Sequence, residues 1–570
     1  MTKKQDRLIV DLGILFGAFW VVLGLNYYWL SLDPSLPGGD TASLLTFSLE
    51  FAEKLFHQLN LSGAFFSTID YPPLPFCYIT VVYWIFGMSQ QSAYLGTGLW
   101  LAILLPAMYF LGLRLGNRLT GILAALLCAF SPQVLFCSKA FLPDLPLLAL
   151  TAISLYWLVM SEDFSISKYT IYFALTAGLA MLTKVSFIFF ILGPLIISAG
   201  RVIWGQKSNR AGRLALLLVF LLVMAGDIRL FSLADISNWV RGHFYLFMAL
   251  YWAFVLGCWM TARPWLKNQP RAFGNLTAGI FIALAIIGPW YLGALREMFL
   301  KADLHFLGWY QAVGLTWGQV WLSFLGILQG LFPWGILLPL LGLVLLRDRK
   351  FAGFLFSGLA LGFGLTVLSV GYNPYPRYLL PLLPYLALLA VLWLAGTTRV
   401  WRILFTCLIS LALVWQLGGW VLAYHFDFPD RILGISTTLS PQPCGKQYYQ
   451  IAEDLYRELQ KWSKGKKVVL LVSETINPGD PAFDALNFWA RRDNWPLMVD
   501  EEPEISFNSI EKLRNCDFVV FYPQNFKSVA SIQKLMSRKY HAEMQLWKTY
   551  NYYKSERNNE IRLYKINWVN

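Results

Sequence analysis

Residues 9–31 have the sequence IVDLGILFGAFWVVLGLNYYWLS, an almost unbroken apolar run behind the basic start Met-Thr-Lys-Lys-Gln-Asp-Arg. A run of about 22 apolar residues is long enough to cross the hydrocarbon core of a bilayer as one helix. A cleaved signal peptide would have a shorter apolar region and a small-residue cleavage site. We therefore expect a retained transmembrane helix here.

Similar apolar runs recur as far as about residue 424. The chain is 57% hydrophobic and only 14% charged, which excludes an ordinary soluble globular protein. We therefore predict a polytopic α-helical membrane module over residues 1–424 and a soluble domain over residues 425–570, where the composition becomes ordinary. The module should have about thirteen spans, near residues 9–31, 92–113, 119–137, 145–160, 168–183, 185–204, 213–232, 243–262, 273–293, 318–346, 351–371, 378–397 and 400–424.

The loop charges predict which side of the membrane each loop faces. Alternate short loops hold about 18 basic residues, as expected of loops on the cytoplasmic side. These residues are Lys3, Lys4, Arg7, Arg114, Arg118, Lys168, Arg201, Lys207, Arg210, Arg213, Arg263, Lys267, Arg271, Arg347, Arg349, Lys350, Arg399 and Arg402. The N-terminus is therefore expected in the cytoplasm, and an odd number of spans puts the C-terminal domain outside. This placement of the basic residues also argues against nucleic acid as a partner.

Residues 74–88 are apolar but too short to cross the membrane. A span here would also move every later basic loop to the other side. We therefore predict a helix along the outer interface, inside a first outer loop of residues 32–91.

The C-terminal domain has the alternating pattern of a small α/β layer. Strands are expected near 466–473, 517–522, 542–551 and 560–567, and helices near 447–463, 481–492, 508–514 and 526–538. It has no Gly-rich phosphate loop. Cys444 and Cys516 would form a disulfide or remain two thiols. The five histidines of the chain are scattered without metal-ligand spacing, so no structural zinc is predicted.

Polar residues gather at the outer ends of the predicted spans. Asp40 follows Gly-Gly at the start of an amphipathic stretch, where an N-cap would also explain it. Tyr71 belongs to the turn Asp-Tyr-Pro-Pro, which also suits a simple loop exit. Asp144 lies in the short loop Phe-Leu-Pro-Asp-Leu-Pro, at the mouth of a span.

Two basic residues lie at the same helix ends. Lys184 ends Leu-Thr-Lys and Arg377 precedes Tyr378 in Gly-Tyr-Asn-Pro-Tyr-Pro-Arg-Tyr. Each could simply reach the headgroups. Together with the two acids they could form an anion-binding cleft that faces the bilayer. Pro-Trp-Tyr at 289–291 ends another span on this side and also fits an aromatic belt.

In this order, the motifs resemble those of GT-C fold glycosyltransferases, in particular the protein mannosyltransferase and aminoarabinose transferase superfamily of bacterial family 39-like enzymes. The resemblance covers residues 1 to about 424. It implies an enzyme of the bacterial cytoplasmic membrane that transfers a sugar from a polyprenyl-phosphate donor to a lipid, glycan or protein acceptor on the outer face.

The resemblance also implies roles for individual residues. Asp40 matches the catalytic acid of the first loop and Asp144 the acid of the second, while Lys184 and Arg377 match basic positions near the lipid phosphate. Tyr71 and Tyr378 accompany these positions in the donor site. Many members have Asp-Glu in the first loop, whereas this chain has Asp40-Thr41. No cofactor is certain, and a divalent cation between Asp40 and the phosphate stays open.

Two other functions remain open. A transporter or flippase of lipid-linked sugars would share the groove but should have ionisable residues near the midplane and internal repeats. Asp227 and Arg229 are the only hint of ionisable residues near the midplane. A receptor or assembly protein would not need so many spans or polar residues gathered at one set of helix ends.

Overall fold

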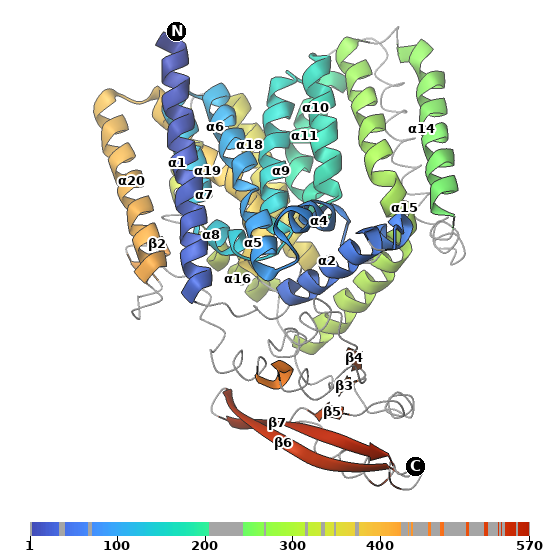
Figure 1. The fold of residues 1–570 in the computed structure, drawn as a ribbon. Helices are drawn as coiled ribbons and strands as arrows, with labels where there is room; N and C mark the ends of the chain where they lie inside the picture. The colour runs from blue at the N-terminus through green and yellow to red at the C-terminus, as the bar shows by residue number, and fades with distance from the viewer. Residues whose placement is uncertain are drawn as a thin grey trace. The chain divides into compact units, whose positions relative to one another are not determined.

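The computed structural model describes most of the membrane module and parts of the C-terminal region (Figure 1). The described residues are 3–32, 40–56, 58–66, 71–204, 243–266, 270–313, 317–331, 337–346, 349–370, 375–422, 431–432, 435–436, 454–457, 468–471, 497–500, 518–521, 534, 537, 542–554 and 557–568. They divide into two compact units. The first unit is Met1–Tyr28, Lys54–Val81 and Tyr94–Ser440, and the second is Trp29–Glu53, Val82–Ala93 and Pro441–Asn570.

The first unit is almost entirely helical. Its helices, two of which continue into the second unit, are α1 (Lys3–Leu32), α3 (Leu61–Phe65), α4 (Leu74–Phe86), α6 (Leu101–Leu115), α7 (Arg118–Ala129), α8 (Pro132–Ser138), α9 (Asp144–Met160), α10 (Ser167–Met181), α11 (Phe187–Trp204), α14 (Phe244–Leu266), α15 (Arg271–Val313), α16 (Trp317–Gly330), α17 (Leu337–Leu345), α18 (Arg349–Val370), η1 (Pro376–Leu382), α19 (Leu383–Leu392), η2 (Trp393–Gly396) and α20 (Arg399–Leu422). The helix α5 (Gln90–Gly98) runs across the boundary between the units and leads into α6. Helices α9, α10 and α11 lie side by side (Figure 1).

The predicted polytopic helical membrane fold is confirmed. Among the described residues, seven helical stretches are long and apolar enough to cross a bilayer, and the bent pair α7–α8 would make an eighth. Helices α9 and α11 are apolar but shorter. The expected span at 213–232 lies outside the described residues, so the number thirteen stays a prediction.

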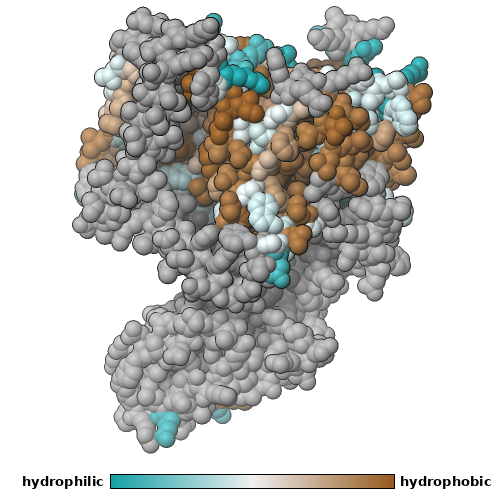
Figure 2. Space-filling model, turned by 180° about the vertical axis from the view of Figure 1, so that it is seen from behind, coloured by the Kyte–Doolittle hydropathy of each residue, from teal (hydrophilic) through white to brown (hydrophobic). Residues whose placement is uncertain are grey.

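The outer surface of the helices supports this fold. Figure 2 shows hydrophobic residues in brown over much of the visible face of the helices, with hydrophilic residues gathered toward one edge. Large apolar side chains point outward, among them Phe16 at 62% exposed and Phe254 at 68%. A soluble protein rarely exposes so large an apolar surface, whereas lipid covers it at no cost.

Three predicted spans differ from the structure. The segment 119–137 is bent by 60° between α7 and α8. The segment 318–346 forms two helices, α16 and α17, and residues 332–336 between them lie outside the described residues. The helix expected at 273–293 continues through Pro289 to Val313.

The bend between α7 and α8 is stabilised by two distant segments, α20 and the residue that follows α16. Pro132 at the start of α8 cannot donate the hydrogen bond that would continue α7. The Val134 N–H donates to the Ser131 carbonyl across the bend, which leaves the Phe130 carbonyl for another donor. The Gln416 amide of α20 donates to it at 2.6 Å, and the Ser131 hydroxyl donates to the Leu331 carbonyl at 2.9 Å. Satisfied backbone groups make such a break tolerable at membrane depth.

Helix α4 begins where the short apolar segment was expected. It covers only 13 residues, which agrees with a helix that does not span. Its location along the outer interface stays a prediction. The backbone N–H of Leu74 donates to the Leu182 carbonyl at 3.0 Å, which ties the start of α4 to the chain after α10.

The second unit contains α2 (Asp40–Phe56) and a five-stranded mixed sheet. The strand order is β4-β3-β5-β7-β6, with β3 (Val468–Leu471) parallel to both β4 (Leu497–Asp500) and β5 (Phe518–Phe521). The strands β6 (Ala542–Lys554) and β7 (Arg557–Trp568) form an antiparallel pair. All four expected strands are confirmed, and β4 is additional.

The other expectations for the C-terminal region are tested only in part. Residues 454–457 are helical within the expected helix 447–463, and the expected helices 481–492 and 508–514 lie outside the described residues, as do Cys444 and Cys516. The two short strands β1 (Arg431–Ile432) and β2 (Ile435–Ser436) pair with each other in the first unit.

Candidate active site at the helix ends

A buried ion pair forms where α9 begins and α10 ends. Asp144 is the first residue of α9 and its side chain is only 1% exposed. Lys184 follows α10, and its Nζ lies 2.9 Å from Asp144 Oδ1. The lysine is 19% exposed, so its side chain links the buried carboxylate to the surface of the unit. Asp144 Oδ2 is buried, and no donor among the described residues reaches it.

Arg377 and Tyr378 reach the same place from η1. The Tyr378 ring centre lies 4.9 Å from Lys184 Nζ and 5.1 Å from the Arg377 guanidinium carbon. Arg377 Nη2 also donates to the Tyr378 hydroxyl at 3.3 Å. The Tyr375 ring lies 5.4 Å from the same guanidinium. Both cations thus lie within the range of a cation–π contact with one tyrosine.

The packing of η1 explains this convergence. It lies against α8 and α9 within the first unit. Three charged residues that are far apart in the sequence therefore surround one helix end.

The turn that contains Tyr71 is fixed beside this cluster through its backbone. Pro72 and Pro73 are buried, and the turn ends at Leu74, whose N–H donates to the carbonyl of Leu182. That carbonyl lies two residues before Lys184. The Tyr71 backbone is therefore held near the Leu-Thr-Lys segment.

Trp290 and Tyr291 support the same segment. The Tyr291 hydroxyl donates to the Met181 carbonyl at 2.8 Å, and Trp290, which is fully buried, packs against Leu182. An interfacial belt would expose these rings to headgroups, so the structure corrects that interpretation for Trp290. The sequence signal was the Pro-Trp-Tyr motif, but burial of the indole was not visible in it.

Asp40 begins α2, so the helix start predicted there is confirmed. The Asp40 side chain is not among the side chains that the structure describes, and α2 belongs to the second unit. Asp227 and Arg229, the hint of a transporter, also lie outside the described residues. Among the residues that the structure describes, no group of three or more His, Cys, Asp or Glu side chains could hold a metal ion.

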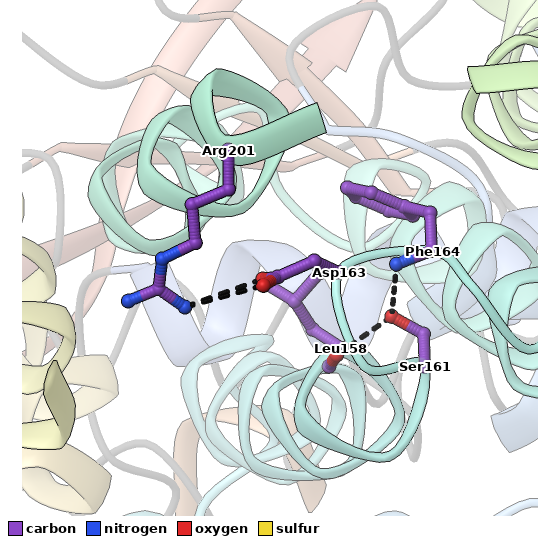
Figure 3. Close-up of polar contacts among 5 residues, drawn as sticks. All are labelled: Leu158, Ser161, Asp163, Phe164 and Arg201. Carbon is purple, nitrogen blue, oxygen red and sulfur yellow. Dashed lines mark hydrogen bonds and ion pairs between the residues drawn. The ribbon is translucent and has the colours of Figure 1, made fainter. Parts of the chain in front are cut away.

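At the opposite end of α9, two acidic residues form ion pairs near the surface of the unit. The turn at residues 162–164 has three consecutive left-handed residues, with φ of 49°, 54° and 64°. Asp163 points toward Arg201 of α11, with Nη1 3.3 Å from Oδ1 (Figure 3). Glu162 pairs with Arg114 of α6 at 2.7 Å. Both pairs are partly exposed to solvent, as expected of surface ion pairs that anchor a loop, whereas the pair at the other end of α9 is buried.

Comparison with known proteins bears on this cluster. Residues 70–226 match the family model described as dolichyl-phosphate-mannose-protein mannosyltransferase. The match includes Tyr71, Asp144 and Lys184 and ends before Arg377. The resemblance to GT-C glycosyltransferases of the protein mannosyltransferase superfamily is thereby confirmed over this part of the chain. No curated protein matches the chain.

Two solved structures show loose overall similarity. ArnT from Cupriavidus metallidurans, bound to undecaprenyl phosphate, is 14% identical with a TM-score of 0.48, and the alignment covers 97% of each chain. The oligosaccharyltransferase AglB from Archaeoglobus fulgidus, in complex with an inhibitory peptide and a dolichol-phosphate, is 12% identical with a TM-score of 0.49. That alignment covers 96% of this chain and 74% of AglB. The chain is a multi-pass membrane protein, and the family match supports a glycosyltransferase.

Proposed function

We propose that this protein is a membrane glycosyltransferase that moves a sugar from a polyprenyl-phosphate donor to an acceptor hydroxyl. The observation that carries the proposal is the meeting of Lys184, Arg377 and Tyr378 around the buried Asp144. Two cations held at the end of an apolar helix suit an anionic headgroup attached to an apolar tail. The family match over Asp144 and Lys184 supports the same reaction class.

In this mechanism the two cations hold the phosphate of the donor. The acceptor oxygen attacks the anomeric carbon, and the bond between that carbon and the phosphate oxygen breaks. The electron pair of the broken bond goes to the phosphate, whose new charge Lys184 and Arg377 stabilise. Asp40 takes the proton of the acceptor hydroxyl as general base. A single displacement inverts the anomeric carbon.

Asp144 has a different role from Asp40. Its Oδ1 is occupied by Lys184, so it orients the lysine. No donor among the described residues reaches its buried Oδ2, and an unsatisfied carboxylate oxygen costs about 1–3 kcal/mol, which a hydroxyl or N–H would relieve. A hydroxyl of the acceptor or of the donor sugar would satisfy it. Tyr71, whose backbone is tied to the Leu182 carbonyl through Leu74, completes the donor site.

The reaction would take place on the outer face of the bacterial cytoplasmic membrane. Basic residues at the Arg114 and Arg201 ends of their helices mark the cytoplasmic side under the positive-inside rule. The N-terminus is then cytoplasmic. Residues 1–424 form the catalytic module, residues 425–570 form an extracytoplasmic accessory domain, and the sugar is a hexose or pentose. A divalent cation between Asp40 and the phosphate would add to the neutralisation of charge.

A transfer assay in proteoliposomes tests the proposal against a flippase. Polyprenyl-phosphate donor with a labelled sugar is supplied to purified protein together with membrane-envelope acceptors, and the lipid that co-purifies is identified by mass spectrometry. The proposal expects a labelled acceptor and free polyprenyl phosphate. Movement of intact donor between leaflets without cleavage would overturn it in favour of a transporter.

A matched pair of lysine variants sharpens the assay. Lys184→Met should reduce transfer by at least about tenfold, because it removes one of two charge contacts to the leaving group. Lys168→Met is the control, since Lys168 is exposed and contacts the rings of Tyr169 and Tyr172 at the other end of the helices. Equal rates for the two variants would contradict the assigned site.

A further inference from the structure

The Tyr378 ring lies within cation–π distance of both cations of the site, Lys184 and Arg377. Lys184 Nζ lies 4.9 Å and the Arg377 guanidinium carbon 5.1 Å from its centre. The two cations come from chain segments that are far apart in the sequence. The tyrosine is half-buried, and η1 holds its backbone against α9.

An aromatic ring attracts cations in a way that a carboxylate does not. Its quadrupole draws a cation to the π-face without cancelling the cation's charge. Two like charges brought near each other repel, and Asp144, which pairs with Lys184, already offsets one of them. The shared ring offsets part of the remaining repulsion without adding a second negative charge at the site.

We propose that Tyr378 is a positioning residue whose ring sets the spacing of Lys184 and Arg377 for a phosphate. This inference rests on the proposed function only in naming the anion as the polyprenyl phosphate of the donor. Cleavage turns a phosphodiester into a phosphomonoester, which gains a second negative charge near neutral pH. Correct spacing of two cations therefore matters more for the released lipid phosphate than for the intact donor.

The test measures binding, so that it does not depend on turnover. Affinities for a short-chain polyprenyl phosphate and for the uncleaved sugar-bearing donor are measured on full-length protein in detergent, for wild type, Tyr378→Phe and Tyr378→Leu. The phenylalanine variant keeps the ring and loses only the 3.3 Å contact from Arg377, so Kd for polyprenyl phosphate should rise by about threefold or less. The leucine variant loses two cation–π contacts, and Kd should rise by about tenfold or more.

Tyr375→Leu provides the matched control. The Tyr375 ring contacts Arg377 at 5.4 Å, and the structure records no contact of this ring with Lys184 among the described residues. Its effect on Kd should therefore be smaller than that of Tyr378→Leu. In the Tyr378→Leu variant, the rise in Kd should be larger for polyprenyl phosphate than for the intact donor.

Equal affinities for Tyr378→Phe and Tyr378→Leu would overturn the inference. The inference would also be overturned if the folded fraction of Tyr378→Leu bound both ligands with the wild-type Kd while less of the protein was folded. A purely structural role of the ring changes the number of binding sites and not their affinity. Wild-type protein that binds polyprenyl phosphate but transfers no sugar would overturn the proposed function, while the ratio of Kd values would still decide the role of the ring.

Discussion

Replacing Lys184 by methionine should destabilise the membrane module more than any exposed lysine substitution. Asp144 is 1% exposed, and Lys184 Nζ, at 2.9 Å from Oδ1, is its counterion. Removing one partner of a buried ion pair costs about 3–5 kcal/mol, because the other charge stays buried. Lys184 is itself 19% exposed, so we expect about 3 kcal/mol, at the lower end of that range.

The decisive comparison adds a second substitution. In Asp144→Asn the side chain keeps its shape and its Oδ1 can still accept from Lys184, so the loss should be only about 1 kcal/mol. In the double variant Lys184→Met with Asp144→Asn, no unpaired charge is buried. It should therefore be more stable than Lys184→Met alone by about 1–2 kcal/mol.

Unfolding of the purified protein by SDS in mixed micelles measures these differences, with Lys168→Met as a surface control that changes stability by less than about 0.5 kcal/mol. A double variant whose loss equals the sum of the two single losses would refute the reasoning. It would mean that Asp144 and Lys184 contribute independently and that the burial of the carboxylate is not the source of the cost.

Two further predictions concern the packing of the module. Gln416→Leu removes the donor to the Phe130 carbonyl at the bend of α7 and α8. It should lower the unfolding free energy by about 1–3 kcal/mol in the same SDS titration. An unchanged midpoint would show that the bend does not need this amide. Gly342→Ala would place its Cβ against the Leu389 carbonyl oxygen, so it should sharply reduce the yield of folded protein on size-exclusion chromatography. Gly353→Ala should behave as wild type, because the added Cβ meets no described atom within 4 Å beyond its own stretch of helix.

The sequence predicted the helices well where hydropathy alone decides them. The expected spans at 351–371 and 400–424 agree with α18 and α20 within two residues at each end. The strands β3 and β5 were found because short β-branched runs stand out in a soluble tail. The bend before Pro132 was missed, because hydropathy measures apolar content and is blind to the Gln416 side chain that makes the bend tolerable.

The candidate site could also be predicted from the sequence only in part. Topology alone placed Asp144 and Lys184 at the same set of helix ends, since consecutive helices reverse direction. The 2.9 Å ion pair and the contact of both cations with Tyr378 depend on how η1 packs against α8 and α9, which no local pattern encodes. The aromatic-belt alternative stayed open for Trp290 for the same reason, because burial of an indole depends on its neighbours in space.

The central claim is most directly tested at Asp40, the proposed general base. Sugar transfer from polyprenyl-phosphate donor is measured in proteoliposomes for wild type, Asp40→Asn and Glu53→Gln, an exposed acid on the same helix, at matched amounts of folded protein. The account predicts that Asp40→Asn loses about 10²–10⁴-fold in rate, while Glu53→Gln remains near wild type. An Asp40→Asn variant that reaches the membrane normally and transfers sugar at the wild-type rate would contradict it.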